Sequence, residues 1–164
     1  MKKILIINTG GTFNKVYNPL TGDLDIERSG KAIKAIAKAW LTEFEIKNII
    51  GKDSLDLTDE DRTTIIKTIQ DSREKNIIII HGTDTIDKTA MCIKNANIEK
   101  NIVLTGAMVP YSVNPIESVA NLASSYGYLQ NYNIKGVCIS MNGIIKDYKR
   151  VVKNKEKGYF EESK

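Results

Sequence analysis

Two runs of branched apolar residues, each closed by a glycine turn, constrain the fold of this chain more than any other feature. Residues 4–7 precede Thr9-Gly10-Gly11-Thr12, and residues 77–80 precede His81-Gly82-Thr83-Asp84-Thr85. Short β-branched runs that end at glycine are typical of strands buried on both faces of a parallel sheet. The loops that leave the carboxyl ends of neighbouring parallel strands converge on one crevice. The sequence therefore predicts that both threonine turns face the same crevice.

Segments of strand character alternate along the chain with segments of helical periodicity. The expected strands are residues 3–8, 44–50, 76–81, 101–105 and 136–141. Helices are expected between them, with Ser29, Thr58 and Asn114 as their N-terminal caps. This β-α-β-α order predicts an α/β fold, a three-layer αβα sandwich with a mostly parallel, Rossmann-like sheet and right-handed crossovers. The chain length of 164 residues fits one domain.

The composition is that of an ordinary globular protein, with 41% hydrophobic and 27% charged residues. A net charge of +4 is too small to indicate a nucleic-acid partner. Cys92 and Cys138 lie in apolar stretches, and one histidine without a C-x-x-C pattern leaves no zinc site, so we expect no metal and no cofactor. The apolar run at residues 4–7 is too short for a signal peptide or a membrane span. We therefore expect a cytoplasmic protein without a membrane partner, and a loose polar end from about Lys153 onward.

The hydroxyl and carboxylate groups of the two turns are the candidate reaction groups. Two hydroxyls in one crevice, one of them beside a carboxylate, are typical of nucleophilic acyl transfer. The Gly-Gly turn alone would be a tight strand exit, and neither a dinucleotide loop nor a P-loop pattern is present. Thr83-Asp84 would by itself be a helix start, or a site for a ligand that bears an ammonium and a carboxylate group. We interpret His81 as a packed, hydrogen-bonded residue without a catalytic role.

Three motifs together resemble those of the bacterial-type L-asparaginase family. They are Thr9-Gly10-Gly11-Thr12, His81-Gly82-Thr83-Asp84-Thr85 and Leu104-Thr105-Gly106-Ala107-Met108-Val109-Pro110. Asp53-Ser54-Leu55-Asp56-Leu57-Thr58 resembles the substrate-binding Asp-Ser segment of that family. Counting without gaps from Met141-Asn142-Gly143 brings Lys153 onto the family's catalytic lysine, and Asn121-Leu122 falls where the family has Asn-Leu. The resemblance covers nearly the whole chain.

The resemblance implies hydrolysis of L-asparagine to L-aspartate and ammonia. It implies that Thr12 is the nucleophile and that Thr83, Asp84 and Lys153 form a second polar triad. The resemblance also implies substrate contacts: Asp84 binds the α-amino group and Ser54 binds the α-carboxylate. Amides near Gly11 and Thr83 would hold the oxyanion, and Ala107 would contact the leaving amide through its backbone. Tyr17 would be the active-site tyrosine. Family members usually carry a second, C-terminal domain, whereas we expect residues 1–164 to form one domain that resembles their N-terminal domain.

Two alternatives to this function stay open. One is a binding or regulatory protein that senses an amino acid in the same pocket without turnover. The other is an amidase that acts on another amide, such as glutamine or a glutaminyl group of a larger molecule. Leu55, where the family usually has a polar residue, bears on substrate affinity. We also expect a homo-oligomer, a dimer or a tetramer, in which the helix at 114–129 presents Tyr126 or Tyr128 to a neighbouring chain.

Overall fold

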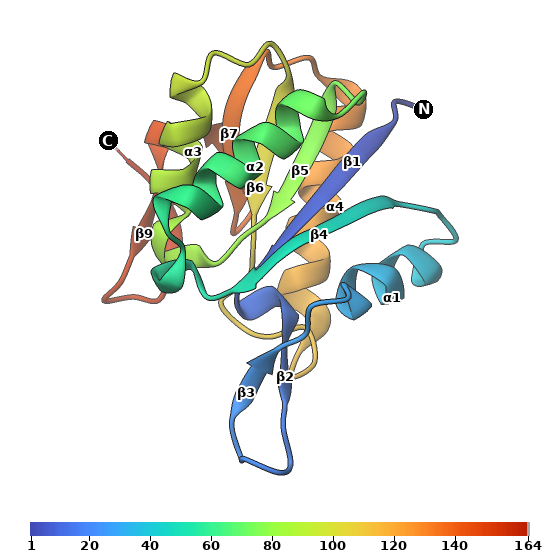
Figure 1. Cartoon of the computed structure of the whole chain (residues 1–164), viewed down its shortest axis with the longest axis vertical. Helices are drawn as coiled ribbons and strands as arrows, with labels where there is room; N and C mark the ends of the chain where they lie inside the picture. Colours follow the sequence, from blue (N-terminus) through green and yellow to red (C-terminus); the bar gives the residue numbers. More distant parts are fainter. Residues whose placement is uncertain (164) are drawn as a thin grey trace.

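A six-stranded sheet forms the centre of the computed structural model, which describes residues 1–163 (Figure 1). In spatial order its strands are β4 (Glu45–Lys52), β1 (Ile4–Gly10), β5 (Asn76–Ile80), β6 (Asn101–Thr105), β7 (Gly136–Met141) and β8 (Ile144–Asp147). The first five are parallel, and β8 pairs with β7 in antiparallel orientation. All five predicted strands are confirmed, with ends that differ by at most two residues.

Helices cover both faces of the sheet, which confirms the predicted three-layer α/β sandwich. The helices are α1 (Lys31–Ala39), α2 (Asp59–Asp71), α3 (Ile86–Asn95) and α4 (Pro115–Asn131). Alternate residues of each central strand enter opposite cores. Leu5 and Ile77 pack in the core beneath α2 and α3, whereas Ile6 and Ile78 pack in the core beneath α1 and α4. This burial on both faces explains why the central strands are unbroken apolar runs in the sequence.

Two of the three predicted helix caps are confirmed. Thr58 forms a capping box with Asp61 at the start of α2, and the Asn114 side chain accepts a hydrogen bond from the backbone N–H of Ile116. Ser29 is not the cap of α1, because Gly30 occupies that position with φ of 73° and its Cβ would lie 2.9 Å from Asn48 Oδ1. A left-handed backbone with no room for a side chain requires glycine there.

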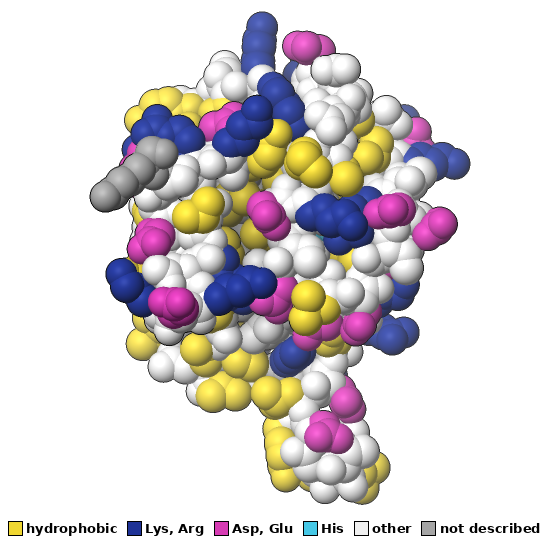
Figure 2. Space-filling model, turned by 90° about the vertical axis from the view of Figure 1, so that its left-hand side faces the viewer, with side chains coloured by type: hydrophobic (Ala, Val, Ile, Leu, Met, Phe, Trp, Pro, Cys, Tyr) yellow, Lys and Arg dark blue, Asp and Glu magenta, His cyan; other side chains and the backbone are white. Residues whose placement is uncertain are grey.

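Two hairpins extend from the main sheet. The hairpin of β2 (Lys15–Tyr17) and β3 (Leu24–Ile26) projects from the body in Figures 1 and 2. The hairpin of β9 (Val151–Asn154) and β10 (Tyr159–Glu162) lies near α3. The expectation of a loose end from Lys153 onward is therefore wrong. Phe160 anchors this hairpin, because its side chain is buried in the α2–α3 core and its backbone N–H donates to Asn142 Oδ1.

The tyrosines of α4 pack within their own chain. Tyr126 contacts Trp40 and Phe44, with ring centroids 6.1 and 5.4 Å away, and Tyr128 lies 5.0 Å from Tyr132. Both rings are partly buried and pack against the α1–α4 core. The expectation that one of them faces away from the core is therefore wrong. Within residues 1–163, no helix combines the length and apolar character that a membrane crossing needs.

Candidate active site

The turns after β1, β5 and β6 meet at one edge of the sheet, and their glycines make this approach possible. A Cβ atom on Gly11 would lie 2.5 Å from both Gly82 Cα and Gly82 N. A Cβ atom on Gly82 would lie 2.7 Å from Ser54 Cβ, and one on Gly106 would collide with the carbonyl oxygen of His81. Any larger residue would push these backbones apart. The predicted convergence of the two threonine turns is therefore confirmed, and Ser54 joins them.

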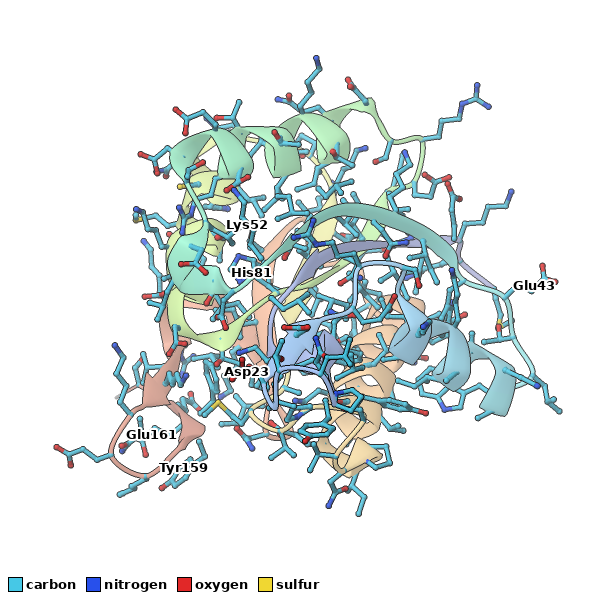
Figure 3. All side chains as sticks on the ribbon, turned by 60° about the horizontal axis from the view of Figure 1, so that its bottom comes forward. Asp23, Glu43, Lys52, His81, Tyr159 and Glu161 are labelled. Carbon is cyan, nitrogen blue, oxygen red and sulfur yellow. The ribbon has the colours of Figure 1, made fainter. Side chains whose placement is uncertain are left out.

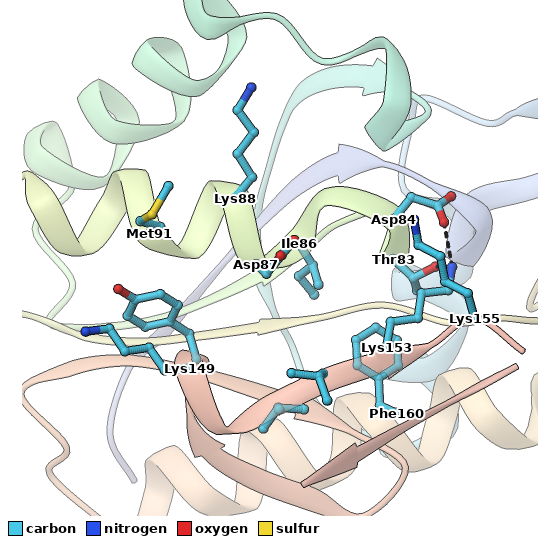
Figure 4. Close-up of a pocket in the computed structure, with 13 residues that line it drawn as sticks. Thr83, Asp84, Ile86, Asp87, Lys88, Met91, Lys149, Lys153, Lys155 and Phe160 are labelled. Carbon is cyan, nitrogen blue, oxygen red and sulfur yellow. Dashed lines mark hydrogen bonds and ion pairs between the residues drawn. The ribbon is translucent and has the colours of Figure 1, made fainter. Parts of the chain in front are cut away.

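Thr83, Asp84 and Lys153 form a contiguous polar cluster (Figure 4). Lys153 Nζ lies 2.8 Å from Thr83 Oγ1 and 2.7 Å from Asp84 Oδ1. The side chains of Lys153 and Asp84 are 15% and 34% exposed. Lys153 reaches the cluster because β9 continues from the buried Val151 and pairs with the anchored Phe160. The structure thus brings together the three residues that the family resemblance grouped, from positions 70 residues apart.

Thr12 opens a 3₁₀ turn (Thr12–Asn14) directly after Gly11. Thr83 likewise opens a 3₁₀ turn (Thr83–Thr85), which leads into α3. The first N–H of such a turn has no partner within the turn, and neither threonine N–H meets an acceptor elsewhere in residues 1–163. The Gly11 N–H, in contrast, donates to the carbonyl oxygen of Lys52 at 2.9 Å. The backbone N–H groups of Thr12 and Thr83 are therefore available to a ligand, whereas that of Gly11 is already bonded within the protein.

Ser54 opens the 3₁₀ turn between β4 and α2 and is buried against the Thr83–Thr85 turn, with 1% of its surface exposed. Its Oγ accepts hydrogen bonds from the backbone N–H groups of Asp84 (3.1 Å) and Thr85 (3.3 Å). Thr85 Oγ1 in turn donates to the Ser54 carbonyl oxygen at 2.8 Å. A hydroxyl that accepts two hydrogen bonds still has its own proton to donate. Next to it, Asp53 forms an ion pair of 2.6 Å with Lys15, which ties the segment after Thr12 to the Ser54 segment.

The loop with Ala107 is held by two side chains of α4 that the sequence analysis did not assign to the site. Glu117 accepts hydrogen bonds from the backbone N–H groups of Met108 and Val109, each at 3.0 Å. Asn121 Nδ2 donates to the carbonyl oxygen of Gly106, also at 3.0 Å. These contacts fix the loop, in which Ala107 is fully buried, backbone included.

Tyr17 does not join this cluster. It lies on the projecting β2–β3 hairpin, opposite Leu24, and is 64% exposed. Within residues 1–163, no hydrogen bond connects its hydroxyl to Thr12, Thr83 or Lys153. β2 begins directly after the Thr12–Asn14 turn and carries Tyr17 out along the hairpin.

His81 is buried behind the turn, as predicted, and Figure 3 shows it inside the ribbon. Its Nδ1 lies 2.7 Å from the Gly82 carbonyl oxygen, which only accepts, so Nδ1 carries the proton and Nε2 accepts from Thr89 Oγ1 at 2.8 Å. Arg62, also buried, donates to Thr89 Oγ1 and to Thr85 Oγ1 at 3.2 Å each. Burial lowers the pKa of His81 to about 4. The imidazole is therefore neutral and supports the turn at neutral pH.

This low pKa predicts a loss of stability in mild acid. The unfolded chain binds a proton at His81 below about pH 6.5, whereas the folded chain does not until about pH 4, so the free energy of unfolding falls between these values. The full difference corresponds to about 3 kcal/mol. Urea unfolding between pH 7 and pH 4.5 should show this fall, and His81→Asn should show a shallower one. Equal slopes for the two proteins would contradict the assignment.

No group of three or more His, Cys, Asp or Glu side chains in residues 1–163 is arranged to hold a metal ion. A cavity of about 490 Å³ lies between α3 and the segment from Tyr148 to Phe160 (Figure 4). Thr83, Asp84 and Lys153 line one end of it, and apolar side chains such as Ile86 and Phe160 line its floor. The polar cluster is thus reached from this cavity.

Comparisons with known proteins agree with this geometry. The glutaminase-asparaginase of Acinetobacter glutaminasificans is 27% identical over 154 residues, which are 87% of this chain and 46% of that protein. The thermostable L-asparaginase from Thermococcus kodakarensis superposes with a TM-score of 0.83 at 24% identity, over 98% of this chain and 51% of that chain. A probable cytoplasmic L-asparaginase from Campylobacter jejuni gives a TM-score of 0.73 at 26% identity, over 93% and 50% of the two chains.

The chain thus spans about half the length of the relatives that it matches. The family model for the N-terminal part of asparaginase matches residues 3–160, which include every motif that carries the resemblance. With this match over nearly its whole length, the chain belongs to the asparaginase family.

Proposed function

We propose that this chain hydrolyses the side-chain amide of L-asparagine to L-aspartate and ammonia through a threonine nucleophile. The observation that carries the proposal is the cluster of Lys153 Nζ with Thr83 Oγ1 and Asp84 Oδ1, at 2.8 and 2.7 Å, on a turn packed against Gly11. A weak hydroxyl nucleophile needs a proton acceptor within hydrogen-bond reach. The Lys153 amine, 2.8 Å from the Thr83 hydroxyl, lies within that reach.

The groups around the crevice match the two charged ends of the substrate. The second carboxylate oxygen of Asp84 is left for the α-ammonium group, because Lys153 contacts Oδ1. The hydroxyl proton of Ser54 is left for the α-carboxylate, because its oxygen already accepts from the N–H groups of Asp84 and Thr85. The dipole of α3, which begins directly after this turn, also favours an anion there. This pairing favours a zwitterionic amino acid over a simple amide.

The reaction follows from this placement. Thr12 Oγ1 attacks the side-chain amide carbon while its proton passes to the polar cluster, and the oxyanion accepts hydrogen bonds from the N–H groups of Thr12 and Thr83. The C–N bond then breaks, the leaving nitrogen takes up a proton and departs as ammonia, and an ester on Thr12 remains. Water attacks this ester, releases aspartate and restores the threonine. Tyr17 takes no step, because it lies on the exposed hairpin.

Ammonia release by the purified protein tests this function. We expect turnover of L-asparagine above that of its D-form, because the two charged ends fix the hand of the substrate. L-Glutamine is the second substrate to measure, since one relative is named for both activities. Binding of asparagine without ammonia release would instead support an amino-acid sensor, and absence of both would refute the proposal.

We also propose that the chain assembles with copies of itself. Apolar side chains are exposed at the same edge of the sheet as the site. On the hairpin they are Tyr17, Leu20 and Leu24, and on the loop before α4 and its first turn they are Val109, Val113 and Ile116. A neighbouring chain on this edge would exclude water and strengthen electrostatic contacts in the crevice.

This assembly predicts that activity falls on dilution. Sedimentation equilibrium should show a dimer or tetramer at micromolar concentration, and specific activity should decrease in parallel with dissociation. Replacing Val113 and Ile116 by serine should shift dissociation to higher concentration, whereas Leu41→Ser, at an exposed position in the loop before β4, should not. A monomer with full activity at nanomolar concentration would refute the assembly.

A cytoplasmic location is part of the proposal. It is supported by the description of the Campylobacter jejuni relative as probably cytoplasmic. Fractionation of the source cells, with ammonia release measured in each fraction, tests it.

A further inference from the structure

Three asparagines form a hydrogen-bond network around the backbone of Gly10, directly before the Thr12 turn. Asn8 lies in β1, Asn14 ends the 3₁₀ turn and Asn48 lies in β4. Asn14 Nδ2 donates to the Gly10 carbonyl oxygen at 2.7 Å, and Asn8 Oδ1 accepts from the Gly10 N–H at 3.3 Å. Both polar groups of Gly10 are therefore held by side chains.

The amides of Asn8 and Asn14 also bind each other in both directions. Asn14 Nδ2 donates to Asn8 Oδ1 at 2.9 Å, and Asn8 Nδ2 donates to Asn14 Oδ1 at 3.3 Å. The second proton of Asn8 Nδ2 goes to Asn48 Oδ1 at 2.9 Å. The side chains of Asn8 and Asn14 are almost fully buried. All side-chain N–H groups of Asn8 and Asn14 are thus used. Such a buried network holds a single geometry, because any other arrangement of the side chains leaves a buried group unpaired.

This network sets the path of the chain through Thr12. Gly10 is fixed on one side of Thr12 and Asn14 on the other. Between them, the Gly11 N–H donates to Lys52 and the Gly11 carbonyl oxygen accepts from the Asn14 N–H at 3.1 Å. Thr12 is the residue of this turn whose N–H and hydroxyl remain free within residues 1–163. The bonded groups on either side therefore determine where these two free groups point.

We propose that Asn14 is a positioning residue that holds the Thr12 hydroxyl and amide toward the crevice. This inference rests on the proposed function for its catalytic consequence. Asn14 does not touch the substrate; it acts through the peptide between Gly10 and Gly11. A shift of the reacting group by about 1 Å lowers a rate by roughly 100-fold. Loss of Asn14 should therefore lower kcat and leave substrate affinity nearly unchanged.

The kinetic test compares Asn14→Ala with Asn76→Ala. Asn76 belongs to a similar buried pair, with Asn101 Nδ2 at 2.8 Å from Asn76 Oδ1, at the opposite end of the same sheet. Both variants lose buried hydrogen bonds and should lower Tm. For asparagine, we expect Asn14→Ala to lower kcat by about 10- to 100-fold with KM changed by less than about threefold. Asn76→Ala should keep kcat within about twofold. Equal kcat values for Asn14→Ala and the parent protein would refute the inference.

A second readout does not depend on activity. Hydrogen exchange of the Gly11 amide, followed by NMR, should speed up by at least about tenfold in Asn14→Ala and stay unchanged in Asn76→Ala. Where Asn14→Ala does not fold, Asn48→Ala takes its place, because Asn48 is an exposed outer member of the network. Absence of ammonia release by the parent protein would refute the proposed function, whereas unchanged Gly11 exchange in the folded variants would refute the positioning role.

Discussion

Thr12→Val and Thr83→Val should each lower kcat for ammonia release from asparagine by at least about 1,000-fold. Valine keeps the shape of threonine but removes the hydroxyl, so the nucleophile is lost at Thr12 and the proton path is lost at Thr83. Both residues begin 3₁₀ turns at the carboxyl edge of the sheet, and their turns pack against each other through Gly11 and Gly82. Steady-state ammonia release measures kcat, and circular dichroism verifies the fold.

Thr9→Val is the matched control for these two variants. The Thr9 hydroxyl lies in the same turn sequence as Thr12 but donates to the carbonyl oxygen of Ile80 at 2.8 Å, inside the sheet. Its loss should lower stability by about 1 kcal/mol and keep kcat within a few-fold of the parent value. Near-normal ammonia release by both Thr12→Val and Thr83→Val would refute the catalytic assignment.

The prediction of the fold succeeded because burial on both faces leaves a strong signal in the sequence. The runs at 4–7 and 77–80 have no polar interruption, and a turn that contains glycine follows each of them. Gly11 and Gly82 approach each other so closely that no larger residue fits at either position. The predicted cap of α1 was wrong because the left-handed backbone at Gly30, rather than the capping preference of Ser29, determines where the helix begins. Glu27 supplies the capping contacts there by accepting from the N–H groups of Ser29 and Lys31.

The supporting network behind Thr83 was missed although the sequence contains a signal for it. Arg62 precedes Ile65 and Ile69 by three and seven residues, so it lies on the apolar face of α2. A charged residue on such a face needs several hydrogen-bond partners. The partners of Arg62 include the nearby carbonyl oxygens of Leu57 and Thr58. The other two, Thr85 and Thr89, come from a different part of the chain. Pairings of this kind depend on how two helices pack, and periodicity within one helix does not determine them.

Lys153, in contrast to Arg62, was predicted to lie beside Thr83. From the sequence alone, a lysine in a basic and polar segment is a solvated surface residue, and only the family resemblance selected it. The sequence does contain the physical reason, since Val151 and Phe160 are apolar residues on either side of the Gly158 turn. Their burial against the α2–α3 core makes the segment a hairpin and directs the alternate residue Lys153 toward Thr83.

Lys153→Met should therefore lower kcat for asparagine hydrolysis by about 100- to 10,000-fold. Methionine has a similar length and keeps the packing of the side-chain stem, but it neither accepts nor donates the proton at Thr83. It also leaves the Asp84 carboxylate without its partner at 2.7 Å. Because Asp84 then lies free beside the substrate ammonium, KM should change far less than kcat. Ammonia release under saturating asparagine separates the two parameters.

Lys155→Met and Lys157→Met are the controls for this change, since both lysines lie on the exposed turn of the same hairpin. Each removes the same charge from the same segment, so any loss that comes from the overall positive potential should occur in all three variants. We expect kcat within about twofold of the parent protein for these two variants, because salt screens the exposed charges of Lys155 and Lys157. A similar loss in all three variants would show a general electrostatic effect and exclude Lys153 as the proton-handling partner of Thr83.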